Sequence, residues 1–239
     1  MLLGAIVLVC CFASGDLFAQ YGTDIIKTPE LKITFLGHGS LLFEYDGLNV
    51  YADPSGLQYT ENLPKADIVL ITHEHGDHFN PSLLETLRKE STVLLMNDRC
   101  AERINGATVM RNGNSRTVLG LKIDAVPSYN LVHKSDNGEF FHPKGRDNGY
   151  VITFGGKRVY IAGDTENHPE MKALQNIDIA FLPMNLPYTM TPEMVADAAE
   201  GFKPDILYLY HYRDGNTEKL QRLMQDVEGV DLRIKKMYR

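Results

Sequence analysis

Cysteine is scarce in this sequence: there are three among 239 residues, and two of them stand side by side at positions 10 and 11. If the N-terminal segment that contains this pair is removed, Cys100 remains alone and the rest of the chain cannot form an internal disulfide. The stability of that part must then come from packing of its core. No histidine-plus-base pattern surrounds Cys100, so we expect a small core residue there and not a nucleophile.

A surplus of basic residues is also missing. The chain has 24 Lys and Arg against 31 Asp and Glu, a formal net charge of −7, and its Lys and Arg residues form no long run. A nucleic-acid partner requires a basic face that matches the phosphate charge, so this composition argues against one. Small-molecule or lipid-derived ligands that are neutral or modestly anionic suit the charge better.

Internal repeats and low-complexity linkers are absent as well. With 44% hydrophobic and 23% charged residues, the composition predicts a single folded domain over residues 21–239. Gly113 and the Gly155-Gly156 pair are isolated turn signals. No phosphate-binding glycine loop, dinucleotide fingerprint or nucleophile elbow is found.

The first 20 residues differ from the rest. Residues 2–12 are almost uniformly apolar, and the small residue Ala19 follows near a plausible cleavage point. The apolar run is too short for an ordinary transmembrane helix, so we interpret residues 1–20 as a secretory signal peptide of an exported (periplasmic or secreted) protein. A signal peptide usually has a Lys or Arg near its start, and none is present here, so a buried N-terminal helix is an alternative. A lipoprotein with Cys10 as its modified residue is a second alternative, although Val9 stands where a small residue would be expected.

The segment Thr-His-Glu-His-Gly-Asp-His at positions 72–78 follows an apolar run directly. In an extended segment His73, His75 and Asp77 would face one side, while His78 would turn away as a helix begins. Imidazole nitrogen and carboxylate oxygen are ligands that zinc prefers. The alternative is a solvated histidine-rich loop, but four ligand-type residues at this spacing predict a metal site, and two directions suit two adjacent ions.

This H-x-H-x-D-H motif resembles that of the metallo-β-lactamase superfamily of metal-dependent hydrolases. Two later segments resemble further landmarks of that superfamily, in the same order: Ala-Gly-Asp-Thr at 162–165 and Leu-Tyr-His-Tyr at 209–212. The branch with ascorbate-phosphate lactonase-like proteins and N-acyl-phosphatidylethanolamine phospholipase D is more similar still. Its features here are Gly-His-Gly-Ser at 37–40, Asp-Pro at 53–54 and Phe-His-Pro-Lys-Gly at 141–145.

The resemblance implies two divalent ions, with zinc favoured and manganese, iron or nickel as alternatives. One ion would be held by two histidines of the motif with a third histidine, the other by the rest of the motif with the last histidine, and an aspartate would bridge them. The implied ligands are His73, His75 and the third histidine for the first ion, Asp77, His78 and His211 for the second, and Asp164 as the bridge.

The identity of the third histidine is open between two residues. His142 precedes Asp164 by 22 residues, near the usual spacing in the superfamily, whereas His133 precedes it by 31. We prefer His142, because His133 would require a longer unpaired loop to reach the site. Relatives of the phospholipase type place a histidine nearer to Asn130, and the sequence departs from them there.

Several single residues near these motifs are further candidates. We assign catalytic roles to Asp77, which can steer or relay a proton, and to His38, which can orient a ligand or protonate a leaving group. Tyr188 is an alternative donor of a proton to the leaving group. Asp53 either accepts a hydrogen bond from a ligand histidine or starts a turn. His168 caps a helix or contacts substrate, and Lys144 either contacts an anion or is an exposed lysine.

The hydrophobic pattern predicts an α/β (α+β) protein with a four-layer αββα sandwich. Helices are expected from Pro81, from Pro192 after the capping residue Thr191, and over residues 217–227. Strands are expected from short β-rich runs separated by Gly, Asp and Pro, and the ligand loops would gather along one rim of the sheets, as the resemblance implies. These strands span 31–36, 41–45, 48–52, 68–71, 93–96, 117–119, 121–126, 150–154, 158–162 and 205–210.

Two classes of function fit these features. The first is a hydrolase that cleaves an ester-like bond, such as a lactone, phosphodiester or lactam, with a water molecule activated by two metal ions. The second is a non-hydrolytic metal-binding or redox module on the same scaffold. We favour the hydrolase, because His75 and all the aspartates are present and no electron-transfer domain is attached. Residues 133–149 and 185–190 are the expected pocket walls.

Overall fold

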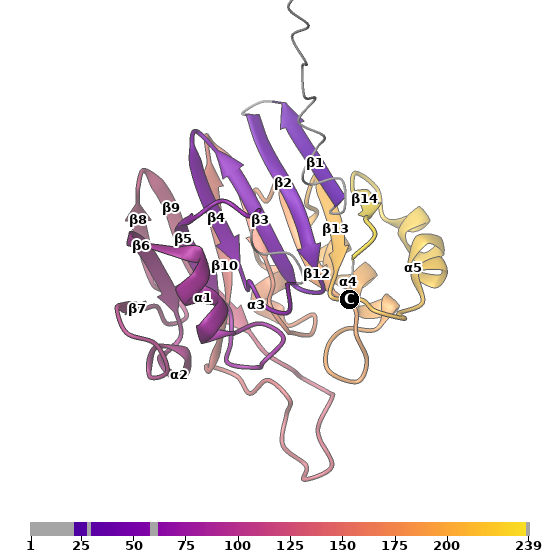
Figure 1. The fold of residues 1–239 in the computed structure, drawn as a ribbon. Helices are drawn as coiled ribbons and strands as arrows, with labels where there is room; N and C mark the ends of the chain where they lie inside the picture. Colours follow the sequence, from indigo (N-terminus) through magenta and orange to yellow (C-terminus); the bar gives the residue numbers. More distant parts are fainter. Residues whose placement is uncertain (1–21, 28–29, 58–61, 238–239) are drawn as a thin grey trace, which may run out of the picture.

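Two seven-stranded β-sheets stacked face to face form the centre of the structure (Figure 1). The computed structural model describes residues 22–27, 30–57 and 62–237. The predicted signal peptide, residues 1–20, lies outside these described residues.

The first sheet keeps its strands in chain order. Strands β1 to β4 pair as an antiparallel meander, and β4 to β7 pair in parallel. The parallel part brings the carboxyl ends of β4, β5 and β6 to one edge of the sheet. The strands are β1 (Gly22–Lys27), β2 (Glu30–Gly37), β3 (Ser40–Tyr45), β4 (Leu48–Ala52), β5 (Ala66–Ile71), β6 (Arg88–Met96) and β7 (Ala107–Val109).

The second sheet repeats this arrangement with the order β14-β13-β12-β11-β10-β9-β8. Strands β8 to β11 pair in antiparallel fashion, and β11 to β14 pair in parallel. The Gly155-Gly156 turn joins β10 to β11 with both glycines at positive φ, as its sequence predicts. The strands are β8 (Ser115–Val118), β9 (Leu121–Ser128), β10 (Asp147–Phe154), β11 (Lys157–Ile161), β12 (Ile179–Pro183), β13 (Ile206–Tyr210) and β14 (Asp231–Ile234).

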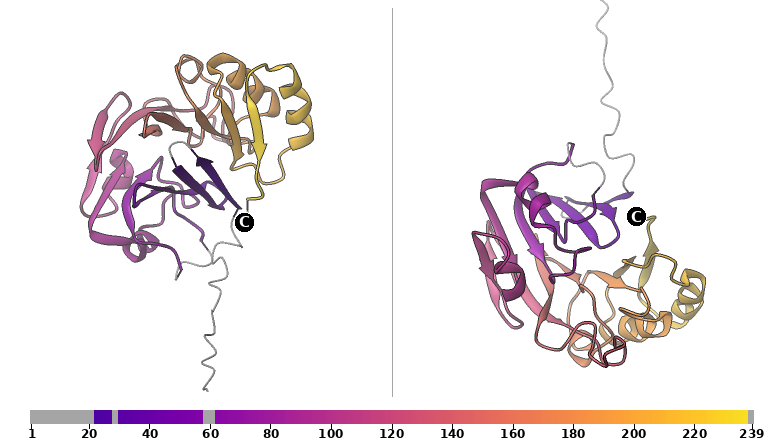
Figure 2. Two further views of the ribbon diagram at one scale, coloured as in Figure 1. Left: turned by 90° about the horizontal axis from the view of Figure 1, so that it is seen from above. Right: turned by 60° about the horizontal axis from the view of Figure 1, so that its bottom comes forward.

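The helices cover the outer faces of the two sheets (Figure 2). Those on the first sheet are α1 (Pro81–Leu87) and α2 (Asp98–Ala101), and those on the second are α3 (Pro169–Lys172), α4 (Pro192–Phe202), α5 (Thr217–Leu223) and the 3-10 turn Met224–Asp226. Asn80 caps α1 and Thr191 caps α4, each with proline following in the first turn. Among the described residues, no helix combines the length and the apolar character needed to cross a membrane.

Three apolar clusters separate the layers. The largest lies between the sheets and includes Phe35 and Phe43, whose ring centroids lie 6.0 and 5.7 Å from that of Phe181. The other two fill the spaces between each sheet and its helices. Cys100 is buried in one of them, as predicted for a core residue. The four-layer αββα prediction is therefore confirmed.

Four strands were not expected from the sequence: β1, β7, β12 and β14. Strand β12 is an apolar run of five residues, all buried, and such a run does not show the alternation of a half-exposed strand. Strands β7 and β14 have three and four residues, too few for a periodic pattern. Strand β1 pairs with β2 over residues 22–27 as an edge strand.

His168 caps α3, the structural alternative that the sequence left open. Its Nδ1 accepts a hydrogen bond from the Met171 N–H at 3.1 Å, and its Nε2–H donates to the Pro127 carbonyl oxygen at 3.1 Å. Both bonds together require a neutral ring, and burial lowers the pKa of His168 to about 4. An unfolded histidine has a pKa of about 6.5, so the unfolded chain binds more protons at acidic pH.

We expect His168→Asn to reduce the loss of stability on acidification. Because the folded pKa lies below the unfolded one, the stability from neutral His168 is lost as the pH falls from about 6.5 towards 4. The stability that His168 loses between pH 7 and pH 5 amounts to about 2 kcal/mol. Asparagine can still cap the helix, but it takes up no proton in this pH range. Urea unfolding of both proteins at the two pH values measures it. Equal losses in the two proteins would contradict this role of His168.

Candidate metal centre

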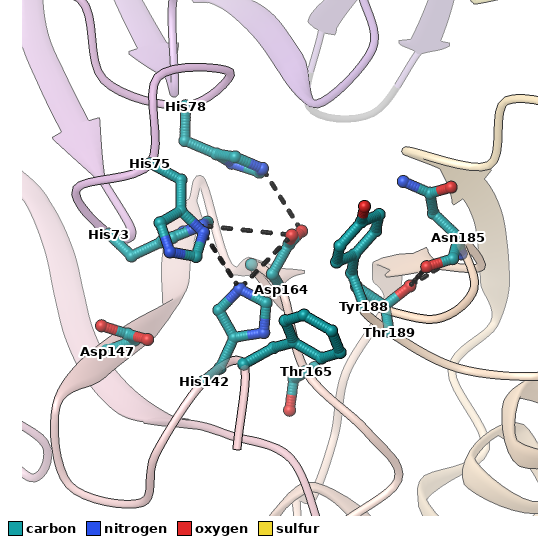
Figure 3. Close-up of polar contacts among 12 residues, drawn as sticks. His73, His75, His78, His142, Asp147, Asp164, Thr165, Asn185, Tyr188 and Thr189 are labelled. Carbon is teal, nitrogen blue, oxygen red and sulfur yellow. Dashed lines mark hydrogen bonds and ion pairs between the residues drawn. The ribbon is translucent and has the colours of Figure 1, made fainter. Parts of the chain in front are cut away.

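The predicted ligands come from loops at one edge of the two sheets. His73, His75, Asp77 and His78 follow β5, Asp164 follows β11, and His211 follows β13. His142 comes from the long connection between β9 and β10, which projects beyond the sheets in Figure 1. Figure 3 shows the side chains of His73, His75, His78 and His142 converging on Asp164. The fold thus brings residues that are up to about 140 positions apart in the sequence together at one edge of the sheets.

One group of donor atoms contains three histidines and one carboxylate oxygen. His75 Nδ1 lies 3.1 Å from His73 Nε2 and 3.3 Å from His142 Nε2. Asp164 Oδ2 lies 4.0 Å from His73 Nε2 and 3.6 Å from His142 Nε2. Ligands at about 2.0–2.1 Å from a tetrahedral zinc ion are about 3.3 Å apart, so this group has the right size for one ion.

A second group lies on the other side of the Asp164 carboxylate. Its Oδ1 lies 3.3 Å from His78 Nε2 and 3.5 Å from His211 Nε2. Asp77 Oδ2 lies 3.4 Å from His211 Nε2 and 4.0 Å from His78 Nε2. The two oxygens of Asp164 therefore face different groups, which is the arrangement of a bridging carboxylate.

Two atoms of the second group support its capacity to bind a cation. His78 Nε2 and Asp164 Oδ1 are buried and form an ion pair at 3.3 Å, but within the described part of the chain neither makes a well-formed hydrogen bond. Poorly satisfied buried polar atoms are costly, and a metal ion would satisfy both of them. The His and Asp groups can thus bind divalent metal.

Residues behind the histidines fix which ring nitrogen faces the group. Asp53 Oδ2 accepts from His78 Nδ1–H at 2.8 Å, which confirms the first of its two predicted roles. Asn130 Oδ1 accepts from His142 Nδ1–H at 2.7 Å, and Thr72 Oγ1 lies 3.0 Å from His73 Nδ1. Each contact leaves Nε2 of the ring free to bind metal as a neutral imidazole.

Asn130 and Glu166 are functional residues that the sequence did not reveal as such. The buried Glu166 carboxylate accepts from the backbone N–H groups of residues 131, 132 and 133 and from Asn130 Nδ2. Asn130 in turn holds His142. No motif signals this chain of contacts, because it depends on backbone donors brought together across 33–36 residues.

Of the remaining candidates, His133 and Lys144 lie outside the two groups, whereas His38 adjoins the second group, with its donor atom within 4.8 Å of those of Asp77 and His211. His133 Nδ1 lies 2.6 Å from Glu166 Oε1, so the structure places His142, and not His133, beside Asp164. Lys144 is exposed and pairs with Glu170 at 2.6 Å. His38 Nε2 donates to Asp77 Oδ2 at 3.0 Å, and its ring lies 3.8 Å from that of His211 between centroids.

The charges of the site favour a cation between the carboxylates. Burial lowers the pKa of His73 well below its ordinary value and that of His142 to about 4, so both rings are neutral at pH 7. Burial alone would raise the pKa of Asp164, but the neighbouring His211 and His78 hold it well below the usual range. Burial alone would lower the pKa of His78, but Asp164 and Asp53 raise it well above its ordinary value. Metal binds neutral imidazole and ionised carboxylate, so an ion at the second group would replace the proton of His78.

Two glycines let the backbone approach the site closely. A Cβ on Gly39 would lie 3.0 Å from Cε1 of His78 and 3.3 Å from Cδ2 of His211. Gly163 has a φ of +68°, and a Cβ there would lie 3.0 Å from Cβ of Thr72. Side chains at either position would therefore push the ligand segments apart.

A pocket of about 350 Å³ opens over the two groups. Tyr188 and Asn185 lie on the side of Asp164 away from His73 (Figure 3). Phe141 and Tyr188 contact each other edge to face, with their ring centroids 4.9 Å apart. The expected walls, residues 133–149 and 185–190, both contribute to it. The lining residues are His75, Asp77, Phe141, His142, Asp164, Asn185, Tyr188, His211 and Arg213.

Comparison with known families supports a hydrolytic metal centre. A profile described as "Beta-lactamase superfamily domain" matches residues 32–211, a span that contains all the residues of the two groups. The UPF0173 metal-dependent hydrolase of Methanopyrus kandleri is 28% identical over 225 residues, covering 85% of this chain and 95% of the relative. That of Nanoarchaeum equitans is 32% identical over 191 residues, covering 76% and 84%.

Solved structures with the same fold include two described as metal-dependent or metallo hydrolases. A candidate metal-dependent hydrolase from Parabacteroides distasonis is 45% identical, with a TM-score of 0.84, and the match covers 92% of this chain and 99% of that one. The metallo hydrolase Igni18 from Ignicoccus hospitalis shares the fold at 24% identity, with a TM-score of 0.67 and coverage of 87% and 96%.

Proposed function

Because this chain belongs to the beta-lactamase superfamily and is a metal-dependent hydrolase, we propose that it cleaves an ester-like bond with water activated by two divalent metal ions. The bond would be a lactone, phosphodiester or lactam of a small molecule or lipid. The observation that carries the proposal is the pair of donor groups that share Asp164, with contacts of 3.1–4.0 Å.

Each donor group would hold one ion, and zinc suits the histidine nitrogens best. Bound there, the ions would lower the pKa of a shared water molecule and stabilise negative charge on the attacked group. The first group is His73, His75, His142 and Asp164, and the second is Asp77, His78, His211 and Asp164.

His38 and Asp77 are the catalytic residues of the proposal. Burial lowers the pKa of His38, so its ring is neutral at pH 7 and Nε2–H is the donor to Asp77 Oδ2. This bond fixes the orientation of a carboxylate whose side chain is 41% exposed. Burial alone would raise the pKa of Asp77, but its contacts with His211 and His38 hold it far below the usual range. Asp77 therefore stays ionised, and it can steer the attacking water by accepting a hydrogen bond from it and relaying its proton. Tyr188, which is 43% exposed and lines the pocket, is placed to protonate a leaving group.

Two narrower features belong to the same proposal. The motifs at 37–40, 53–54 and 141–145 favour the branch of ascorbate-phosphate lactonase-like and phospholipase D-like proteins. The apolar segment in residues 1–20 favours export from the cytoplasm. A fusion of residues 1–20 to a reporter enzyme, followed by cell fractionation, tests the second feature.

Metal analysis together with a substrate screen tests the function. We expect purified protein to hold about two equivalents of divalent metal, and to hydrolyse at least one of a phosphodiester, a lactone and a lactam. Chelation should abolish turnover and zinc should restore it. His73→Ala should lose both metal and turnover. Full turnover by His73→Ala would refute the mechanism, and retained metal without any hydrolysis would favour a non-hydrolytic module.

A further inference from the structure

We propose that Arg213 binds an anionic group of the substrate, so that this enzyme acts on small acids with an apolar body. The inference rests on the proposed function, because it concerns the substrate of the same pocket. Arg213 lines the pocket together with the predicted ligands His75, Asp77 and His211. Among the described residues, it is the one Lys or Arg in that lining.

The guanidinium of Arg213 is available to a ligand. The residue is exposed, and the structure shows no ion pair or hydrogen bond of its side chain within residues 22–27, 30–57 and 62–237. Arg146 and Arg99, which lie near the same edge, are instead paired with Asp147 and Glu74. A planar guanidinium with free donors is suited to bidentate binding of a carboxylate or phosphate.

The turn that carries Arg213 is held in a fixed conformation. Both His211 and Arg213 have positive φ, at 47° and 37°. His211 N–H donates to the His38 carbonyl oxygen at 3.0 Å, and Gly215 N–H donates to the Tyr212 carbonyl oxygen at 2.6 Å. Non-glycine residues at positive φ persist where the surrounding contacts impose them, and they cluster at functional sites. The backbone of Arg213 is therefore held in place next to the site, two residues after the predicted metal ligand His211.

The aromatic rings of Phe141 and Tyr188 form an apolar part of the pocket lining. Of the six large hydrophobic side chains that are exposed in the described part of the chain, four belong to the loops around it. Asn130 Nδ2 donates to the Tyr188 carbonyl oxygen at 2.9 Å, so these two loops meet. Through Arg213, Phe141 and Tyr188, the pocket thus offers a positive group and an apolar wall to one ligand. The four side chains are Leu131, Val132, Leu186 and Tyr188, which are 45%, 62%, 53% and 43% exposed.

The charge of the ligand follows from these contacts. Asp77 and Asp164 are the acidic groups in the lining, and both belong to the proposed metal ligands. With divalent ions bound, their negative charge is balanced, and Arg213 adds a positive charge that nothing else in the lining offsets. A neutral substrate would leave the charge of Arg213 unpaired, whereas an anionic substrate would form charge-assisted hydrogen bonds with its guanidinium.

Binding of two matched ligands tests the inference. We expect the zinc-loaded protein to bind phenylacetate at least about tenfold more tightly than phenylacetamide in calorimetric titrations, and Arg213→Gln to weaken phenylacetate binding about tenfold. Arg213→Lys should have an intermediate affinity. Arg222→Gln, at an exposed arginine on α5, is the matched control and should bind phenylacetate as the unaltered protein does. Unchanged phenylacetate affinity in Arg213→Gln would overturn the inference.

Kinetics with a matched pair of esters separates this inference from the proposed function. The probes are 4-nitrophenyl hydrogen succinate and its neutral methyl ester, which differ in one distant charge. Arg213→Gln should lower the ratio of kcat/KM for the acid to kcat/KM for the ester at least about tenfold, mainly through KM. If turnover of both esters is indifferent to chelation, the proposed function fails, while the binding comparison still decides the role of Arg213.

Discussion

Replacing His142 with alanine is expected to reduce the bound metal from about two equivalents to one and to lower kcat/KM by more than about 100-fold. The loss should exceed the 10- to 100-fold that follows from losing a residue behind a ligand, because His142 Nε2 lies 3.3 Å from His75 Nδ1 and 3.6 Å from Asp164 Oδ2. Elemental analysis and steady-state kinetics on a substrate found in the screen measure both effects.

His133→Ala is the matched control for that variant. His133 belongs to the same connection between β9 and β10, but its ring contacts Glu166 and lies outside both donor groups. Metal content should stay near two equivalents, and kcat/KM should change less than about threefold. Circular dichroism and the Tm would establish that both variants fold. Metal loss in His133→Ala together with full activity in His142→Ala would contradict the assignment.

Most of the residues that the structure brings together around Asp164 could be predicted from the sequence and its resemblance to the superfamily, because they are close in sequence or follow a recognisable strand. Four of them stand within residues 73–78, where a single turn after β5 positions them. Asp164 and His211 each follow an apolar run that forms a buried strand, and buried parallel strands end at the same edge. For His142, spacing alone left His133 open, because a loop of 18 residues between β9 and β10 can return to the edge in many ways.

For Asp53, support of a ligand histidine was one of the two predicted roles, but the other supporting residues, Asn130 and Glu166, could not be predicted in the same way. Glu166 is close to Asp164 in sequence, but its role depends on three backbone N–H groups of the 131–133 turn. Such donors carry no sequence signal, since every residue except proline supplies one. The same limit applies to β12 and β14, whose pairing partners are set by tertiary contact and not by periodicity.

Asp53→Asn is expected to lower the affinity for the second metal ion by about 10- to 100-fold, although the side chain keeps its shape. Asp53 Oδ1 accepts from Thr72 N–H at 2.7 Å, and Oδ2 accepts from Thr72 Oγ1–H at 2.6 Å and from His78 Nδ1–H at 2.8 Å. An amide NH₂ in place of Oδ2 cannot accept from His78. The ring would then favour the tautomer with its proton on Nε2, the atom that must bind metal.

Asp53→Ala separates this effect from the stability of the loop. Alanine leaves the buried Thr72 N–H without an acceptor and is strained at the φ of +45° that Asp53 adopts. We expect it to lower the free energy of unfolding by about 3 kcal/mol or more, whereas Asp53→Asn keeps the bond from Thr72 N–H and loses less. Asp46→Asn is the matched control, because Asp46 is exposed and has a φ of +48°. Metal titrations and urea unfolding in chelator measure the two effects, and unaltered metal affinity in Asp53→Asn would show that His78 does not need this carboxylate to present Nε2.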